Sequence, residues 1–319
     1  MLTAVELLFG AVLLLLGGET LVRGAAQIAV RFGLSRLMVG MVIAGFGTSM
    51  PEMVVSVRAV LGGTPGLAAG NVVGSNISNI LLILAIAALI RPIDMPSRKL
   101  DPEGIILLAV SAVVMALGLQ ETIPRWQGAA MVLLMIGIIV MKFREDRTAE
   151  GRQEATEEIV ETVAPFSFDS LKPFVYILIG VVALPLGGDM FVRGAVNIAQ
   201  TLGVSDALIG LTIVAVGTSL PELATTAIAA LRGETTIGYG NIVGSNLFNT
   251  LGIFGVATMV GPMRVPETVV YADGGFMVAA TGVMLIFMST DARLNRIEAA
   301  IMLSAYFAYV TARYVFAMS

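Results

Sequence analysis

Long apolar stretches separated by short polar turns run through the chain from end to end. They lack the charged helix faces, at a period of 3.6 residues, of a large soluble helical protein, and the alternating polarity of membrane β-strands. Each stretch has about the twenty residues that cross a bilayer as a helix. The pattern predicts an all-α membrane protein with ten transmembrane helices, at roughly 3–28, 37–60, 67–90, 103–119, 125–142, 171–198, 207–231, 236–260, 270–289 and 295–316.

The two halves of the chain repeat one another at an offset of 170 residues. Between Gly17–Pro96 and Gly187–Pro266, 32 of 80 aligned positions are identical without a gap. Each copy contains five segments, and five is an odd number, so the second copy must enter the membrane from the opposite side. The sequence therefore predicts two inverted-topology repeats of five helices, a plan common among secondary transporters.

A polar stretch at 143–170, rich in acidic residues, joins the two copies. Its composition is typical of a solvated connector, and it is too short for a folded domain. We predict a first repeat at 1–142 with its motif at 45–79, a cytoplasmic linker at 143–170, and a second repeat at 171–319 with its motif at 215–249.

The composition agrees with a membrane protein and narrows the chemistry. Charged residues make up 13% of the chain, against roughly 25% in soluble proteins. There is no cysteine and no histidine, which excludes disulfides, thiolate chemistry and histidine-based acid–base work. The net charge is -4, and the sequence contains no basic stripe of the kind that binds nucleic acid. We expect the lipid bilayer and small inorganic cations as partners, no nucleic acid, no cofactor, and a monomer.

The distribution of Lys and Arg predicts the orientation. With the N-terminus outside, fourteen of these residues fall on the cytoplasmic side and five on the outer side. Both termini are therefore expected outside the cell.

One glutamate lies deep in the second segment and another deep in the seventh. Residues 47–52 read Gly-Thr-Ser-Met-Pro-Glu, and residues 217–222 read Gly-Thr-Ser-Leu-Pro-Glu. A charge at that depth costs several kcal/mol unless it is paired, hydrated or neutralised. No Lys or Arg occupies a corresponding position in mid-span, so a cation or a proton is the expected partner of Glu52 and Glu222.

The residues around each glutamate offer further oxygen atoms. Pro51 and Pro221 have no backbone N–H and free the carbonyl oxygen four residues earlier, which breaks the helix in mid-membrane. Oxygen ligands without nitrogen or sulfur suit Ca²⁺ or Na⁺ rather than Zn²⁺ or Cu²⁺. Besides the glutamates, the candidate ligands are Thr48, Ser49, Ser75, Asn79, Thr218, Ser219, Ser245 and Asn249.

Other interpretations of these residues remain open. Each glutamate motif could be a kinked helix with a buried, protonated carboxyl, although its occurrence twice at equivalent positions argues against this. The serines and asparagines of the candidate set could serve only in interhelical hydrogen bonds. Structural roles are the favoured interpretation of Asn71, Asn76, Asn241 and Asn246. Glu19 with Arg23, and Asp189 with Arg193, are expected to form ion pairs four residues apart on one helix, and a role in the access path is the alternative.

The two motifs, spanning Gly47–Asn79 and Gly217–Asn249, resemble the Ca²⁺/cation antiporter superfamily, and more closely its sodium/calcium exchanger branch. The resemblance covers nearly the whole chain. It implies a prokaryotic inner-membrane protein with broken helices 2, 3, 7 and 8, in which the first and sixth helices slide past a rigid core. It also implies that Glu52 and Glu222 are the central ligands, with the hydroxyl and amide side chains named above and the backbone oxygens of Gly45 and Ala215.

The resulting hypothesis is a secondary antiporter, not an enzyme, that exchanges Na⁺ for Ca²⁺ by alternating access. Some members of the superfamily have aspartate where this chain has Asn249, so the centre here holds only two formal negative charges. This departure argues against K⁺ co-transport. Proton-coupled Ca²⁺ antiport is the alternative, and a cation channel is a more remote one.

Overall fold

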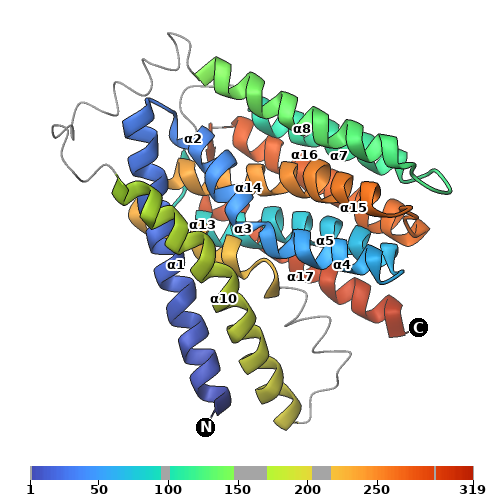
Figure 1. Cartoon of the computed structure of the whole chain (residues 1–319), viewed down its shortest axis with the longest axis horizontal. Helices are drawn as coiled ribbons and strands as arrows, with labels where there is room; N and C mark the ends of the chain where they lie inside the picture. The colour runs from blue at the N-terminus through green and yellow to red at the C-terminus, as the bar shows by residue number, and fades with distance from the viewer. Residues whose placement is uncertain (1, 95–100, 147–170, 203–216, 291, 319) are drawn as a thin grey trace.

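The computed structural model describes residues 2–94, 101–146, 171–202, 217–290 and 292–318, and these ranges are mostly helical (Figure 1). The elements of the first half are α1 (Leu2–Phe32), α2 (Arg36–Val39), η1 (Gly40–Ala44), α3 (Gly45–Thr48), α4 (Met50–Leu61), α5 (Pro65–Ser78), η2 (Asn79–Leu84), α6 (Ala85–Ile90), β1 (Ile93–Asp94), α7 (Pro102–Leu117) and α8 (Arg125–Asp146). Those of the second half are α10 (Lys172–Thr201), α13 (Leu220–Arg232), α14 (Thr235–Leu247), η5 (Phe248–Ile253), α15 (Phe254–Val260), η6 (Val269–Gly274), α16 (Gly275–Thr290), β2 (Arg293–Leu294) and α17 (Arg296–Met318).

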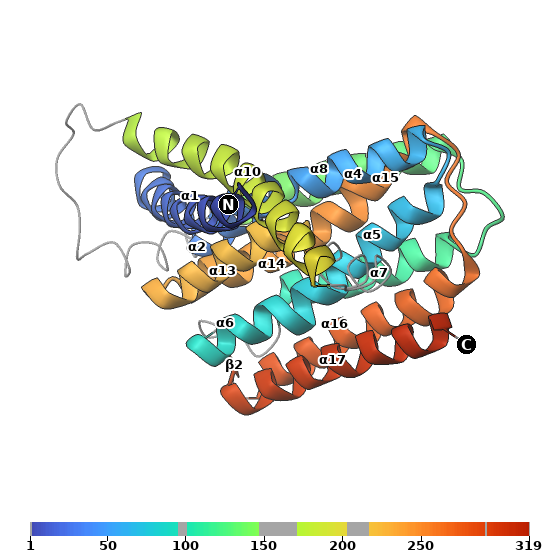
Figure 2. The same cartoon turned by 90° about the horizontal axis from the view of Figure 1, so that it is seen from below.

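The long helices α1 and α10 lie side by side, while α16 and α17 lie on the opposite side of the molecule (Figure 2). They run antiparallel: Gly24 near the end of α1 meets Ile177 near the start of α10, and Gly194 near the end of α10 meets Leu7. Glycine has no side chain, so the two backbones approach closely, as is common where membrane helices pack. Antiparallel packing of the first helix of each half is the arrangement that inverted repeats require.

The second helix of the first half is broken at Ser49, as its proline predicts. The segment Arg36–Thr48 meets α4 at an angle of 46°, and Ser49 has φ -85° and ψ 8°, outside the helical range. In the second half, Ser219 has nearly the same backbone conformation, and α13 begins directly after it. The helix expected before Ser219 lies in 203–216, outside the described residues.

The predicted breaks in helices 3 and 8 are wrong. Residues 65–90 and 235–260 each form one continuous helix of 26 residues. Neither contains a proline beyond its first position, so no carbonyl loses its partner. Each instead contains a π-helical turn, η2 or η5, which accommodates an extra residue within the helix.

Helix α14 forms the centre of the molecule and is buried over nearly its whole length (Figure 1). It packs against η1, where a Cβ on Gly244 would lie 2.2 Å from the carbonyl oxygen of Met41. Gly240 and Gly244 thus allow α14 to pack closely against the broken helix of the first half. A Cβ on Gly70 or Gly74 would meet nothing within 4 Å among the described residues.

The outer surface of the long helices is apolar, as contact with lipid requires. Among the described residues, six helices are long and apolar enough to span a membrane, and the bent pair Arg36–Thr48 with Met50–Leu61 adds a seventh. The ten-span plan and its division into 1–142, 143–170 and 171–319 stay predictions. Large exposed apolar side chains on three of these helices include Leu8, Leu15, Leu133, Ile136, Leu178 and Val182.

Ion pairs form within and between the helices, and one short β ladder joins the two halves. The predicted pairs of Glu19 with Arg23 and of Asp189 with Arg193 are confirmed, at 2.6 and 2.5 Å. Glu19 also pairs with Arg232 of α13, which links α1 to the core. Two-residue strands β1 and β2 pair antiparallel and join the halves, a small addition to the predicted all-α fold.

Candidate cation-binding site

The two motif glutamates occupy the first turns of α4 and α13, immediately after the breaks. Glu52 is 1% exposed and Glu222 is 0% exposed. Pro51 and Pro221 fit near the start of a helix because their missing N–H would have no partner there. Each carboxylate therefore lies at the positive end of a helix, inside the protein.

Serine hydroxyls bond the carboxylates across the two repeats. Ser49 Oγ donates to Glu222 Oε1 at 2.8 Å, and Ser219 Oγ donates to Glu52 Oε1 at 3.5 Å. The Oε2 atom of each glutamate is buried with no hydrogen-bond partner among the described residues. A buried charged oxygen without a partner is costly, so a cation between these atoms would relieve the cost.

Among the described residues, no basic side chain pairs with these carboxylates. In the part of the chain that the structure describes, neither Glu52 nor Glu222 forms an ion pair with Lys or Arg. The buried Glu103, by contrast, pairs with Lys142 at 3.0 Å. The site thus has an excess of negative charge that a positive ion can neutralise.

A second cluster surrounds the break in the first repeat. Thr48 Oγ1 lies 3.3 Å from Ser245 Oγ, and Ser245 Oγ donates to the carbonyl oxygen of Gly45 at 3.3 Å. Thr48 and Ser245 also contact the Glu222 carboxylate. Together with Ser49, which bonds the same carboxylate, three predicted ligands from two distant parts of the chain therefore meet at Glu222.

The equivalent cluster of the second repeat is described only in part. Thr218 contacts the Glu52 carboxylate, and Ser75 is buried. Ala215, the predicted counterpart of Gly45, lies outside the described residues.

Asn79 and Asn249 contribute one unsatisfied oxygen each. Both side chains are fully buried, and the Oδ1 atom of each has no hydrogen-bond partner in the described ranges. Asn79 begins the π-helical turn η2, and Asn249 lies in η5. Such turns often mark functional sites, because they displace side chains from their regular helical positions. The two amide oxygens and the two Oε2 atoms are four buried oxygens of the predicted ligand set without a partner there.

Several residues near the site were not in the predicted ligand set. Ser78 Oγ lies 3.5 Å from Ser219 Oγ. Its counterpart in the second repeat is Phe248, so the repeat comparison that revealed the other ligands gave no signal for Ser78. Thr225 Oγ1 is another buried oxygen without a partner among the described residues, and its counterpart Val55 likewise has no hydroxyl.

Asn71 and Asn241 have the structural roles that the sequence favours. Asn71 Nδ2 donates to Ser56 Oγ at 3.0 Å, and Asn241 Nδ2 donates to Thr226 Oγ1 at 2.9 Å. Both bonds join neighbouring helices within one repeat, and Asn241 Oδ1 also accepts from Thr48 Oγ1 of the other repeat at 3.2 Å.

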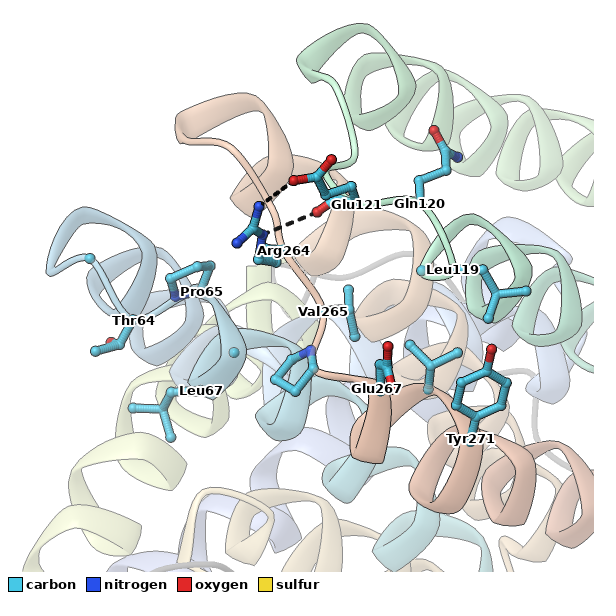
Figure 3. Close-up of a pocket in the computed structure, with 15 residues that line it drawn as sticks. Thr64, Pro65, Leu67, Leu119, Gln120, Glu121, Arg264, Val265, Glu267 and Tyr271 are labelled. Atoms are coloured by element: carbon cyan, nitrogen blue, oxygen red, sulfur yellow. Dashed lines mark hydrogen bonds and ion pairs between the residues drawn. The ribbon is translucent and has the colours of Figure 1, made fainter.

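A pocket of about 690 Å³ lies elsewhere, at the loops that follow α4, α7 and α15 (Figure 3). Arg264 Nη2 donates to Glu121 Oε1 at 2.8 Å on its rim, and the side chains of Glu267 and Tyr271 lie nearby (Figure 3). None of the predicted cation ligands lines this pocket. The candidate site is the buried oxygen cluster in the interior.

Known proteins resemble this chain in sequence and in fold. A family profile described as sodium/calcium exchanger protein matches residues 2–144 and 172–315. The chain is 30% identical to the sodium/calcium exchanger MaX1 of Methanosarcina acetivorans, over 95% of this chain and 96% of that protein. It is 33% identical to the inner membrane protein YrbG of Escherichia coli, over 82% and 81% of the two chains. The solved structure of the sodium-calcium exchanger NCX_Mj, soaked without Na⁺ and Ca²⁺, superimposes with a TM-score of 0.82 at 26% identity, covering 98% of both chains.

Proposed function

Since this chain belongs to the sodium/calcium exchanger family, we propose that it exchanges Na⁺ for Ca²⁺ across the membrane by alternating access. At the coarser level it is a multi-pass membrane transporter of the cation antiporter type. No covalent chemistry is needed, because one cluster of oxygen atoms binds either a divalent ion or several monovalent ions in turn.

Four buried oxygens without partners among the described residues carry this proposal. They are Oε2 of Glu52 and Glu222 and Oδ1 of Asn79 and Asn249. Two come from carboxylates and two from neutral amides, so the set supplies two negative charges, which balance one Ca²⁺ or two Na⁺. Hard cations of this kind prefer oxygen ligands.

The hydroxyl and backbone oxygens complete the proposed site. We infer that they replace water around the ion as it enters, since Ca²⁺ takes six to eight oxygen ligands. Binding must remain moderate, because an ion that is held too tightly would not leave. The proposed additional ligands are Thr48, Ser49, Ser75, Thr218, Ser219 and Ser245 with the backbone oxygens of Gly45 and Ala215.

The antiparallel pair α1 and α10 supplies the moving part in this proposal. It packs along the core helices beside the glutamates, so sliding of the pair would open the site first to one side and then to the other. The ion pair between Glu19 and Arg232 joins the two parts in the arrangement described.

Transport by the purified chain in proteoliposomes tests the proposal. Vesicles loaded with Na⁺ should take up ⁴⁵Ca²⁺ from a Na⁺-free medium and lose this uptake when Na⁺ is equal on both sides. Uptake driven by a pH gradient without Na⁺ would select proton-coupled antiport instead. Currents through single open pores without uphill Ca²⁺ movement would identify a channel and overturn the proposal.

Neutralising the two carboxylates tests the site itself. We expect Glu52→Gln and Glu222→Gln each to lower Na⁺-driven Ca²⁺ uptake by at least an order of magnitude, because each change removes half of the site's negative charge. Glu121→Gln is the matched control, since Glu121 lies on an exposed loop and should leave uptake unchanged. Full uptake by the double variant Glu52→Gln/Glu222→Gln would reject these residues as ligands.

A further inference from the structure

Four asparagine side chains meet where the helix of residues 65–90 contacts the helix of residues 235–260. They are Asn76 of α5, Asn79 of η2, Asn246 of α14 and Asn249 of η5. Asn79 Nδ2 donates to Asn246 Oδ1 at 2.9 Å, and Asn249 Nδ2 donates to Asn76 Oδ1 at 3.1 Å. Asn76 and Asn246 also donate to each other's backbone carbonyl oxygen, both at 3.4 Å. All four side chains are at most 1% exposed.

These bonds determine which way each amide faces. If the Asn79 amide rotated by half a turn, its oxygen would face the oxygen of Asn246. Rotating Asn246 as well would remove the donor to the carbonyl oxygen of Asn76. The same argument applies to Asn249 and Asn76. Because a buried donor or acceptor without a partner is costly, the arrangement with both Nδ2 atoms turned to the opposite repeat is favoured.

The consequence is that Asn79 and Asn249 present only oxygen on their free side. Their Nδ2 atoms are engaged, and their Oδ1 atoms are buried without a partner in the described part of the chain. An amide N–H group pointing into the site would repel a cation, so this orientation matters for binding.

We propose that Asn76 and Asn246 are positioning residues that act across the repeats, Asn76 on the amide of Asn249 and Asn246 on the amide of Asn79. This inference rests on the proposed function in that the two amide oxygens are taken to face the transported cation. Neither Asn76 nor Asn246 need touch the ion. Partners that orient metal ligands typically contribute roughly 10–100-fold to metal affinity.

The two positioning residues, Asn76 and Asn246, differ in how many hydrogen bonds hold them. Asn76 Nδ2 also donates to Thr250 Oγ1 at 2.7 Å, whereas the equivalent position in the first repeat is the apolar Ile80. Asn76 is therefore held by one more hydrogen bond than Asn246. Removing that bond with Thr250→Val should loosen the Asn249 amide and leave the Asn79 amide as it is.

Double-mutant cycles test the crossed assignment. The full chain is purified with Asn76→Leu, Asn79→Ala and Asn249→Ala, singly and in pairs. The apparent KM for Ca²⁺ is measured in proteoliposomes, and Ca²⁺ affinity is measured by calorimetry in detergent. Asn76→Leu should weaken Ca²⁺ binding by roughly 10–100-fold with little change in maximal rate. The double variant Asn76→Leu/Asn249→Ala should bind Ca²⁺ no more weakly than Asn249→Ala alone. In the double variant Asn76→Leu/Asn79→Ala, by contrast, the fold losses of Ca²⁺ affinity of the two single variants should multiply.

Two further variants separate positioning from stability. Asn71→Leu removes an amide that bonds within one repeat. Its effect on Ca²⁺ affinity should therefore multiply equally with that of Asn79→Ala and that of Asn249→Ala. If Asn76→Leu does not fold, Thr250→Val serves in its place, with a rise in KM of roughly two- to tenfold, the size of one hydrogen bond. This rise should vanish in the Asn249→Ala background.

Coupling of Asn76 to Asn79 instead of Asn249, or multiplicative costs in every pair, would overturn the proposal. So would a loss of thermal stability in Asn76→Leu or Thr250→Val with unchanged Ca²⁺ affinity. Absence of Ca²⁺ uptake by the unmodified chain would count against the proposed function instead. In that case the same double-mutant cycles can be measured by the rise in unfolding temperature on adding Ca²⁺ or Na⁺. They would still show whether Asn76 acts on Asn249 or on Asn79.

Discussion

At the scale of single residues, the buried carboxylates differ in what balances them. Glu103 on α7 is paired with Lys142 on α8, whereas the described partners of Glu52 and Glu222 are hydroxyl donors. Asp101 is a third case. It is 7% exposed, and one oxygen accepts from the Tyr239 hydroxyl while the other has no partner among the described residues. A carboxylate that is buried without a basic partner is disfavoured in its charged form.

The burial of Asp101 predicts that the stability of the folded protein depends on pH. Burial raises the pKa of its carboxyl to about 6, with a further contribution from the neighbouring Glu103. The stabilising effect of the protonated form is fully present below the unfolded-state pKa of about 3.9. It is lost as the pH rises through the folded-state pKa of about 6. We therefore expect Asp101→Asn, which stays neutral, to gain stability relative to the unmodified chain between about pH 4 and pH 7.

Thermal unfolding of the detergent-solubilised protein across this range measures the effect. Asp94→Asn is the control, because Asp94 is exposed and paired with Arg293. Its curve should run parallel to that of the unmodified chain. A parallel curve for Asp101→Asn as well would show that this carboxyl does not titrate in the window.

At the scale of elements, prolines and glycines determine where helices bend and where they touch. The bend at Ser49 follows from Pro51 and was predicted. The π-helical turns η2 and η5 were not, because a π turn depends on how the surrounding helices pack and leaves no mark as plain as a proline. The contact between α1 and α10 depends on small residues: a Cβ on Gly187 would lie 2.8 Å from the backbone nitrogen of Leu14.

Adding one methyl group at this contact should separate the two helices. We expect Gly187→Ala to lower the free energy of unfolding by about 1–3 kcal/mol, as overpacking usually does. Gly137→Ala is the matched control, since a Cβ on Gly137 of α8 would meet no atom of the described residues within 4 Å. It should be neutral, or stabilising by up to about 1 kcal/mol through helix propensity. Unfolding in detergent measures both, and equal effects of the two changes would contradict close packing at Gly187.

At the scale of the whole molecule, the arrangement of positive charge predicts the orientation in the membrane. Fourteen Lys and Arg residues fall on one side of the ten-span plan and five on the other. The richer side should be cytoplasmic, which leaves both termini outside.

Reporter fusions test this orientation. A reporter that is active only in the cytoplasm should be active when inserted into the linker at 143–170 and inactive when fused after Ser319. Activity at both positions would contradict the odd number of spans in the second repeat. Activity only at Ser319 would show that the orientation is reversed.

The sequence by itself determined the membrane class, the duplication and the two motif glutamates. These depend on local composition and on identities at a constant offset, which can be counted along the chain. It also identified most of the candidate ligands, because each occurs twice.

Only the tertiary structure decided how those residues meet. Ser49 bonds Glu222, and Asn76 bonds Asn249, each across the two repeats. Such pairings depend on the angle and depth at which distant helices cross, and nothing in a single repeat encodes them. The same holds for the direction of the asparagine amides, which is decided by hydrogen-bond partners from the opposite half of the chain.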